Sequence, residues 1–397
     1  MRSFLNSAIL SLLIATTAAT QQEATRPRRV NASSAINTAT AVASDDVKRA
    51  FALLQAGRFQ AAEEIASRLT TENPADANGW KVVGFAKLGL KKYADAAGAL
   101  ERTRELQRGA GGQEDMHTAR ALAQSLVYAE RFEQALPLLV NMTDETGEAS
   151  KTFNAQTRAE LFTLRGAAEL RTGKAAAAET SFSRAVRLDA KNAPALFYLG
   201  RIAYDAGQLN KAIIMLNRAT LTNARFGDAW HLLSIAYLRR AAEAETRTGD
   251  AASNNASAEA DRLSAVRASA SFMRADSSPA AAQLYAQALI AAKQYARAAE
   301  LLEIYATKNA ASLDPTALYL LGVAHSRTKN YAAAIKRLEQ AAERAADDAS
   351  IQTELGYAYE ITKQYAKALA AYERAAQLSP DDMSLTESIA RVRPFAR

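Results

Sequence analysis

The chain has 397 residues and no cysteine, and its net charge of +7 comes from 49 Lys and Arg against 42 Asp and Glu. The lack of cysteine excludes disulfides, thiolate nucleophiles, cysteine-ligated zinc and a lipid-modified N-terminal cysteine. With 49% hydrophobic and 23% charged residues, the composition is that of a folded chain. Basic and acidic residues alternate throughout, which favours solvated helix faces over a polyanion-binding stripe.

The first twenty residues have the pattern of a secretory signal peptide. Arg2 precedes an apolar run from Phe4 to Ala15, and small residues follow. The run is shorter than the roughly 20 residues that span a bilayer. We therefore expect cleavage near Ala19 and an exported protein, periplasmic or secreted, that is not a lipoprotein. An uncleaved leader, which would hold the chain near a membrane, is the alternative.

Residues 21–42 are rich in Gln, Thr, Ser, Ala and Asn and have no helical apolar stripe. This composition predicts a flexible linker.

From residue 43 onward the chain repeats with a period of 34. Residues 315–348 and 349–382 align without a gap, which places Gly322 over Gly356. The same frame gives repeats that start near residues 43, 77, 116, 159, 193, 227, 279, 315 and 349. Alanine occupies position 20 in every uninterrupted copy, namely Ala62, Ala96, Ala135, Ala178, Ala212, Ala298, Ala334 and Ala368.

This pattern resembles the tetratricopeptide repeat. The last copy carries the motif through Leu355, Gly356, Tyr359, Tyr365, Ala368, Tyr372, Ala375 and Pro380. The resemblance implies an all-α fold, a right-handed superhelical α-solenoid of antiparallel helix pairs with a concave groove lined by the first helices. The small residues of the motif allow the paired helices to approach closely.

Four segments lie outside the repeat pattern. A polar, breaker-rich insertion at about residues 243–258 predicts a surface loop between two helices. Residues 109–113 and 150–158 predict hinges. Residues 383–392 predict a helix that caps the stack.

No catalytic or metal-binding motif occurs in the sequence. The glycines near residue 110 lack the Gly-Lys-Ser/Thr of a phosphate loop, and no histidine pair has metal-ligand spacing. His325 occupies a position where the family places a packing aromatic. The repeats fill nearly the whole chain, so we expect no enzyme activity, no cofactor and no metal.

The resemblance implies that positions 2, 5, 9, 12 and 13 of the first helices line the groove. The residues predicted to bind a partner there are His117, Arg120, Gln124, Tyr128, Phe197, Arg201, Tyr204, Asp205, His231, Arg239, Tyr319 and Arg327. A surface of arginines and aromatic residues suits a peptide that has acidic and apolar side chains. The alternative is that these are ordinary exposed residues that bind no partner. The carboxylate clamp of chaperone-binding relatives is not matched, because Lys81 is followed by Phe85 where an Asn is needed.

These features predict an exported, non-enzymatic scaffold that binds protein or peptide partners, with no small-molecule substrate. A structural spacer or self-associating envelope protein is the first alternative. A polyanion-binding envelope protein is the second, since the sequence pI is about 9.4, although nucleic acid is not an expected partner. The sequence names neither the partner nor the pathway.

Overall fold

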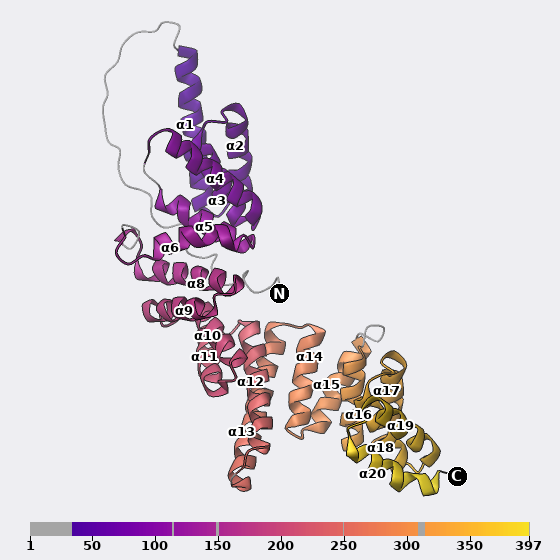
Figure 1. The fold of residues 1–397 in the computed structure, drawn as a ribbon. Helices are drawn as coiled ribbons and strands as arrows, with labels where there is room; N and C mark the ends of the chain where they lie inside the picture. Colours follow the sequence, from indigo (N-terminus) through magenta and orange to yellow (C-terminus); the bar gives the residue numbers. More distant parts are fainter. Residues whose placement is uncertain (1–33, 113–114, 148–150, 249, 309–313, 397) are drawn as a thin grey trace. The chain divides into compact units, whose positions relative to one another are not determined.

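The computed structural model describes residues 34–112, 115–147, 151–248, 250–308 and 314–396, and it describes side chains from residue 45 on, except that of residue 308 (Figure 1). The expected signal peptide, residues 1–20, and residues 21–33 of the expected linker lie outside this part. All regular structure in the described residues is helical, which confirms the predicted all-α fold. The chain divides into two compact units with the boundary between Ile202 and Ala203.

The first unit is built from helix pairs joined by short turns, in which each helix up to residue 188 contacts the next along the chain. Its helices are α1 (Ser34–Gln55), α2 (Phe59–Glu72), α3 (Ala77–Gly89), α4 (Tyr93–Gly109), α5 (Met116–Tyr128), α6 (Phe132–Thr143), α8 (Ala155–Arg171), α9 (Ala175–Leu188) and most of α10 (Ala193–Asp205).

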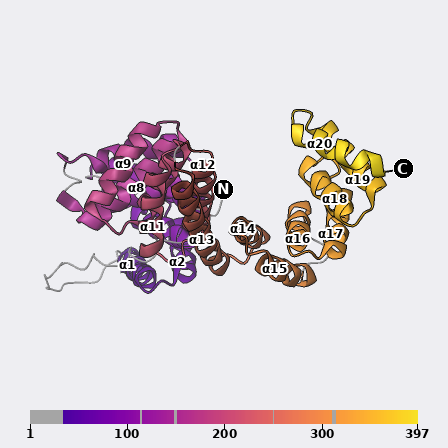
Figure 2. The same cartoon turned by 90° about the horizontal axis from the view of Figure 1, so that it is seen from below.

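The second unit continues the same pattern from the end of α10. Its helices are α11 (Leu209–Thr222), α12 (Gly227–Glu245), α13 (Ala251–Ala275), α14 (Pro279–Ala291), α15 (Tyr295–Lys308), α16 (Pro315–Arg327), α17 (Tyr331–Arg344), α18 (Ala349–Ile361), α19 (Tyr365–Leu378) and α20 (Met383–Val392), followed by the short 3-10 helix η1 (Arg393–Phe395). Figure 2 shows α16 to α20 stacked in order along the chain. Each unit is therefore an α-solenoid by itself.

The first helices start where the 34-residue frame starts its repeats, at Ala77, Met116, Ala193, Gly227, Pro279, Pro315 and Ala349. The exceptions are α1, discussed below, and α8, which begins at Ala155 instead of residue 159. Polar side chains fix several of these starts. The carboxylates of Asp76, Asp115 and Asp348, for example, accept hydrogen bonds from backbone N–H groups of the first turn that would otherwise be unpaired.

The turn inside each repeat has one fixed backbone conformation. Position 15 has a positive φ in all eight uninterrupted repeats, at Gly57, Lys91, Glu130, Gly173, Gly207, Lys293, Lys329 and Lys363. This left-handed residue ends the first helix and allows the chain to reverse into the second. Glycine adopts it without strain, whereas the lysines and the glutamate adopt it at a cost.

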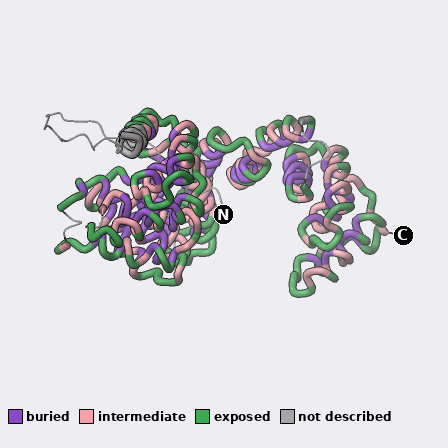
Figure 3. Tube along the Cα trace, turned by 90° about the horizontal axis from the view of Figure 1, so that it is seen from above, coloured by how far each residue is buried: buried purple, intermediate pink, exposed green. Residues whose placement is uncertain are grey.

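Position 8 is where the two helices of a repeat come closest. A Cβ added to Gly84 would lie 2.5 Å from Cγ of Leu100, and one added to Gly356 would lie 2.6 Å from Cδ1 of Tyr372. Leu100 and Tyr372 both occupy position 24, on the second helix of their repeats. The buried residues accordingly follow the facing sides of the paired helices (Figure 3).

The insertion between α12 and α13 does not form the predicted surface loop. Both helices continue through it, and only residues 246–250 lie between them. Ala241, Ala244 and Ala258 are buried against one another there, so the extended helices pack closely although the segment is polar overall. The prediction is wrong because the packing of alanines between the two helices outweighs the weak helix preference of Ser and Asn.

The flexible linker predicted for residues 21–42 is also wrong over its described part, because α1 begins at Ser34. Ala50 is fully buried and Leu54 nearly so, which anchors the C-terminal half of this helix. Extending an existing helix costs far less than starting one, and alanine favours the extension. The lack of an apolar stripe over residues 34–42 therefore did not prevent helix formation.

Candidate partner-binding faces

The four predicted residues of α5 lie on one side of that helix, which we call the α5 face: His117, Arg120, Gln124 and Tyr128. Their spacing of three or four residues places them in line along the helix. The start of α5 is fixed by Asp115, whose carboxylate accepts hydrogen bonds from Lys81 Nζ at 2.5 Å and from the Thr118 hydroxyl at 2.7 Å.

Phe153 covers the first two residues of the α5 face. Its ring packs edge-on against His117 with ring centres 5.7 Å apart, and the Arg120 guanidinium lies 5.9 Å from the ring centre. Phe153 itself is only 7% exposed. It belongs to the segment predicted as a hinge at residues 150–158, so part of that segment is anchored by packing.

Arg120 and Glu160 of α8 form a loose ion pair with nitrogen and oxygen 4.0 Å apart. Burial lowers the pKa of Arg120 and raises that of Glu160, and each charge offsets part of the shift of the other. The Nε of Arg120 is buried without a hydrogen-bond partner in the described part of the chain. This pair is therefore poorly satisfied for its degree of burial.

The rest of the α5 face is covered. Gln124 is 5% exposed, so it does not lie at the surface as predicted, and its contact with a partner stays a prediction. Tyr128 is half-buried, lies 4.8 Å from the Tyr93 ring centre, and has its pKa raised by burial. Position 9 of this repeat faces the packed interior, which a sequence frame alone does not reveal.

His117 provides a test of this burial. Burial lowers the pKa of its imidazole, with Asp115 acting in the opposite direction and Arg120 adding to the lowering. Because the unfolded chain then binds the proton more readily, the stability contributed by neutral His117 is complete above about pH 6.5 and is lost as the pH falls towards the folded pKa.

We expect the thermal midpoint of the protein to fall between about pH 7.5 and about pH 5.5, and His117→Gln to reduce that fall. Scanning calorimetry of both proteins at the two pH values measures the difference. An unchanged pH dependence in the variant would show that His117 is as solvated in the folded state as in the unfolded one.

The predicted residues of repeats five and six are divided between the two units. Phe197 is 3% exposed, so it does not lie at the surface as predicted, and its contact with a partner stays a prediction. Arg201 is half-buried. In the second unit, the Arg239 guanidinium lies 5.3 Å from the ring centre of Tyr204 and donates from Nε to Glu243 at 3.1 Å.

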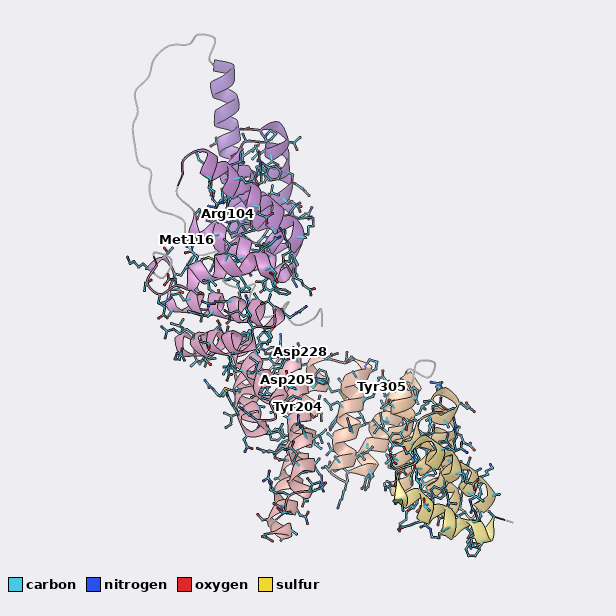
Figure 4. The ribbon with its side chains drawn as sticks, in the orientation of Figure 1. Arg104, Met116, Tyr204, Asp205, Asp228 and Tyr305 are labelled. Carbon is cyan, nitrogen blue, oxygen red and sulfur yellow. The ribbon has the colours of Figure 1, made fainter. Side chains whose placement is uncertain are left out.

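Two further predicted residues belong to this region. Asp205, labelled beside Tyr204 in Figure 4, is exposed at the end of α10. His231 is half-buried with its ring centre 5.0 Å from that of Phe272, and burial lowers its pKa. Both histidines of the predicted set thus pack against phenylalanines.

Apolar and aromatic side chains are exposed beside paired charges on one face of the second unit, the α16–α18 face, formed by Tyr319, Arg327, Glu354, Tyr357 and Ile361. Arg327 donates to both carboxylate oxygens of Glu354, at 2.6 and 3.1 Å, and its guanidinium lies 5.4 Å from the ring centre of Tyr357. Tyr357 is 36% exposed and Ile361 44% exposed. The charges on this face are already paired, so apolar area is what it offers a ligand.

Sequence reasoning found two of these five residues, Tyr319 and Arg327. Tyr357 and Ile361 occupy positions 9 and 13 of the last repeat, so the same frame could have identified them. Glu354 lies outside the groove positions, and its role is visible only in the structure. It also contributes to the raised pKa of Tyr319, which is caused mainly by burial.

The described residues contain no group of three or more His, Asp or Glu side chains placed to hold a metal ion. Within the same ranges, no helix combines the length and the apolar character needed to cross a membrane.

Comparison with known proteins identifies the repeat. Tetratricopeptide-repeat models match residues 169–236, 285–346 and 326–382. No curated protein sequence is significantly similar to the chain.

Solved structures with a similar fold share little sequence with the chain. YrrB, described as a TPR protein with an unusual peptide-binding site, is 15% identical with a TM-score of 0.39, over 52% of this chain and 96% of its own. A monomeric IFIT1 mutant with Gppp-AAAA is 16% identical with a TM-score of 0.42, and the match covers 83% of this chain and 80% of its own. A chain of the APC/C hetero-tetramer Cut9–Hcn1 is 13% identical with a TM-score of 0.31, and the match covers 92% of this chain and 93% of its own. At these values the likeness carries no argument about function.

Proposed function

The chain belongs to the tetratricopeptide-repeat family, and from this premise we propose that it is an exported, non-enzymatic scaffold that binds protein or peptide partners on the faces of its first helices. Repeats of this kind present extended binding surfaces, and their partners are typically proteins or peptides. The observation that carries the proposal is the α16–α18 face.

An apolar surface surrounded by satisfied polar groups is a common arrangement at protein interfaces. On the α16–α18 face, Tyr357 and Ile361 present ring and side-chain area to solvent, while Arg327 is held in place by Glu354. A bound segment would bury this area without first breaking an ion pair. The α5 face is less suited, because Gln124 and Phe153 are buried.

Binding to this face is tested by a crosslinked pull-down from envelope extract. We expect the double variant Tyr357→Ala, Ile361→Ala to reduce recovery of a specific partner at least about tenfold, since truncating two central contacts typically costs more than 1 kcal/mol each. Ile304→Ala is the matched control, because Ile304 is 51% exposed on α15, a second helix of the same unit.

Equal recovery with the wild type and both variants would contradict binding through the α16–α18 face and favour the spacer alternative. Recovery that falls steeply with added salt would favour the polyanion-binding alternative.

The export part of the proposal rests on residues 1–20 alone. It predicts that the protein recovered from its source begins near Gln21 and is found outside the cytoplasm. N-terminal sequencing after cell fractionation tests both points.

A further inference from the structure

The last three first helices, α14, α16 and α18, end in the same unusual way. Lys293, Lys329 and Lys363 have φ values of 58°, 65° and 61°. In each turn, two backbone hydrogen bonds fix this geometry. For Lys363 they run from its own N–H to the Glu360 carbonyl at 2.9 Å and from the Gln364 N–H to the Tyr359 carbonyl at 2.8 Å.

All three lysine side chains are exposed. Within the described ranges, none of them forms an ion pair or a side-chain hydrogen bond. α14 contacts α16, and α16 contacts α18, so the three helices are neighbours within the second unit. Because the axes of packed neighbouring helices lie about 8–10 Å apart, we expect the lysines, one in each repeat, to form a row of cations spaced by about 10 Å. We call it the lysine row.

The lysine row is not required by the fold. At the equivalent position the chain uses glycine three times, at Gly57, Gly173 and Gly207, and glutamate once, at Glu130. Glycine is the residue that this conformation favours. The partial negative charge at a helix C-terminus favours a cation, but it does so equally in the repeats that have none. Strained residues that persist without a local structural reason are often functional.

We propose that the lysine row binds an acidic amphipathic helix of a partner protein, with one carboxylate at every seventh residue. Seven residues of α-helix rise about 10.5 Å and return to nearly the same face, which matches the spacing of the row. An extended strand covers a similar distance in three residues but turns its side chains to alternate faces. This inference rests on the proposed function and names its partner class.

Two observations favour a protein helix over a polyanion. Between residues 279 and 392 the chain has twelve Lys and Arg against thirteen Asp and Glu, so a densely charged polymer would meet as many acidic groups as basic ones. In addition, Ile361 is 44% exposed only two residues before Lys363. A partner with apolar side chains beside its carboxylates would contact both.

The test replaces Lys293, Lys329 and Lys363 together by glycine. Because glycine suits the backbone at each position, the full-length triple variant should have an unchanged or higher thermal midpoint, and lost binding cannot then be attributed to unfolding. Lys91→Gly is the matched control, since Lys91 has the same backbone conformation (φ 60°) and is exposed in the first unit.

Binding is measured by NMR on protein whose lysines carry ¹³C-methyl groups, which keep their charge. The probe is a helical peptide with three glutamates spaced seven residues apart. As the peptide is added, we expect the three signals that the triple variant lacks to shift together, and the Lys91 signal to stay in place. We also expect the triple variant to bind the peptide about tenfold more weakly than the wild type does.

Three outcomes would overturn the proposal. A peptide of equal composition with irregular glutamate spacing could bind equally well, a single-stranded DNA of equal charge could bind more tightly, or the triple variant could have a lower thermal midpoint. The last result would mean that the lysines stabilise the fold itself.

The cellular partner could also be lost in the Tyr357→Ala, Ile361→Ala variant but fully retained in the triple variant. That result would refute binding at the lysine row while leaving the proposed function intact.

Discussion

Gly84→Ala is expected to lower the free energy of unfolding by about 2 kcal/mol, within the range typical of overpacking a core. The added Cβ would lie 2.5 Å from Cγ and 2.7 Å from Cδ2 of Leu100. Leu100 is fully buried on the second helix of the same repeat, so it cannot move aside without disturbing its own neighbours. The two helices would have to separate.

Gly98→Ala is the control in the same repeat. Gly98 is exposed in the interior of α4, and a Cβ there meets no atom within 4 Å. Alanine favours helix over glycine, so this change should stabilise the protein by about 0.5–1 kcal/mol. Urea denaturation followed by circular dichroism compares the two. Because repeat arrays can unfold in steps, the comparison applies to the first transition that either variant shifts. If Gly84→Ala and Gly98→Ala changed the free energy of unfolding equally, the close approach of the two helices at position 8 would not contribute to stability.

The 34-residue period was sufficient to predict most of the helix starts because each repeat uses the same contacts. Gly84 against Leu100 and Gly356 against Tyr372 are one contact made in two repeats. The left-handed turn was only partly visible. Its glycines indicate it in three repeats, but at Lys329 the surrounding backbone hydrogen bonds impose a conformation that the residue itself disfavours.

The candidate faces were harder to predict than the fold. The repeat frame gives the side of a helix on which a residue lies, but not how far its neighbours cover it, and so Phe197 and Gln124 were wrongly placed at the surface. Charge pairing is a second limit. Arg327 pairs with Glu354, 27 residues away, and no local pattern links the two.

Asp261→Ala is expected to destabilise the second unit by about 3 kcal/mol, near the lower end for breaking a buried ion pair. The Asp261 side chain is 6% exposed and accepts two hydrogen bonds from Arg240, from Nε at 2.8 Å and from Nη2 at 2.6 Å. In the described part of the chain, its removal leaves the guanidinium with one hydrogen bond, the 2.7 Å bond from Nη1 to Asn210, and with the contact of its carbon 5.6 Å from the Tyr237 ring centre. The low-end value follows from the 29% exposure of the Arg240 side chain, since water can then replace part of the lost interaction.

A double variant shows whether this pair or the alanine packing holds the extended α12–α13 hairpin together. If packing dominates, Arg240→Leu with Asp261→Leu should be less destabilised than Asp261→Ala alone, because no charge is left unpaired. If the pair dominates, the double variant should be at least as unstable as Asp261→Ala.

Asp347→Ala is the reference variant. Its 2.5 Å pair with Arg374 lies at the surface, where Asp347 is 82% exposed, and such surface pairs contribute less than about 1 kcal/mol. Thermal unfolding of the three variants measures the differences. The buried Ala241, Ala244 and Ala258 beside the pair lead us to expect the first result, in which the ion pair fixes the register of two helices that small side chains already allow to pack.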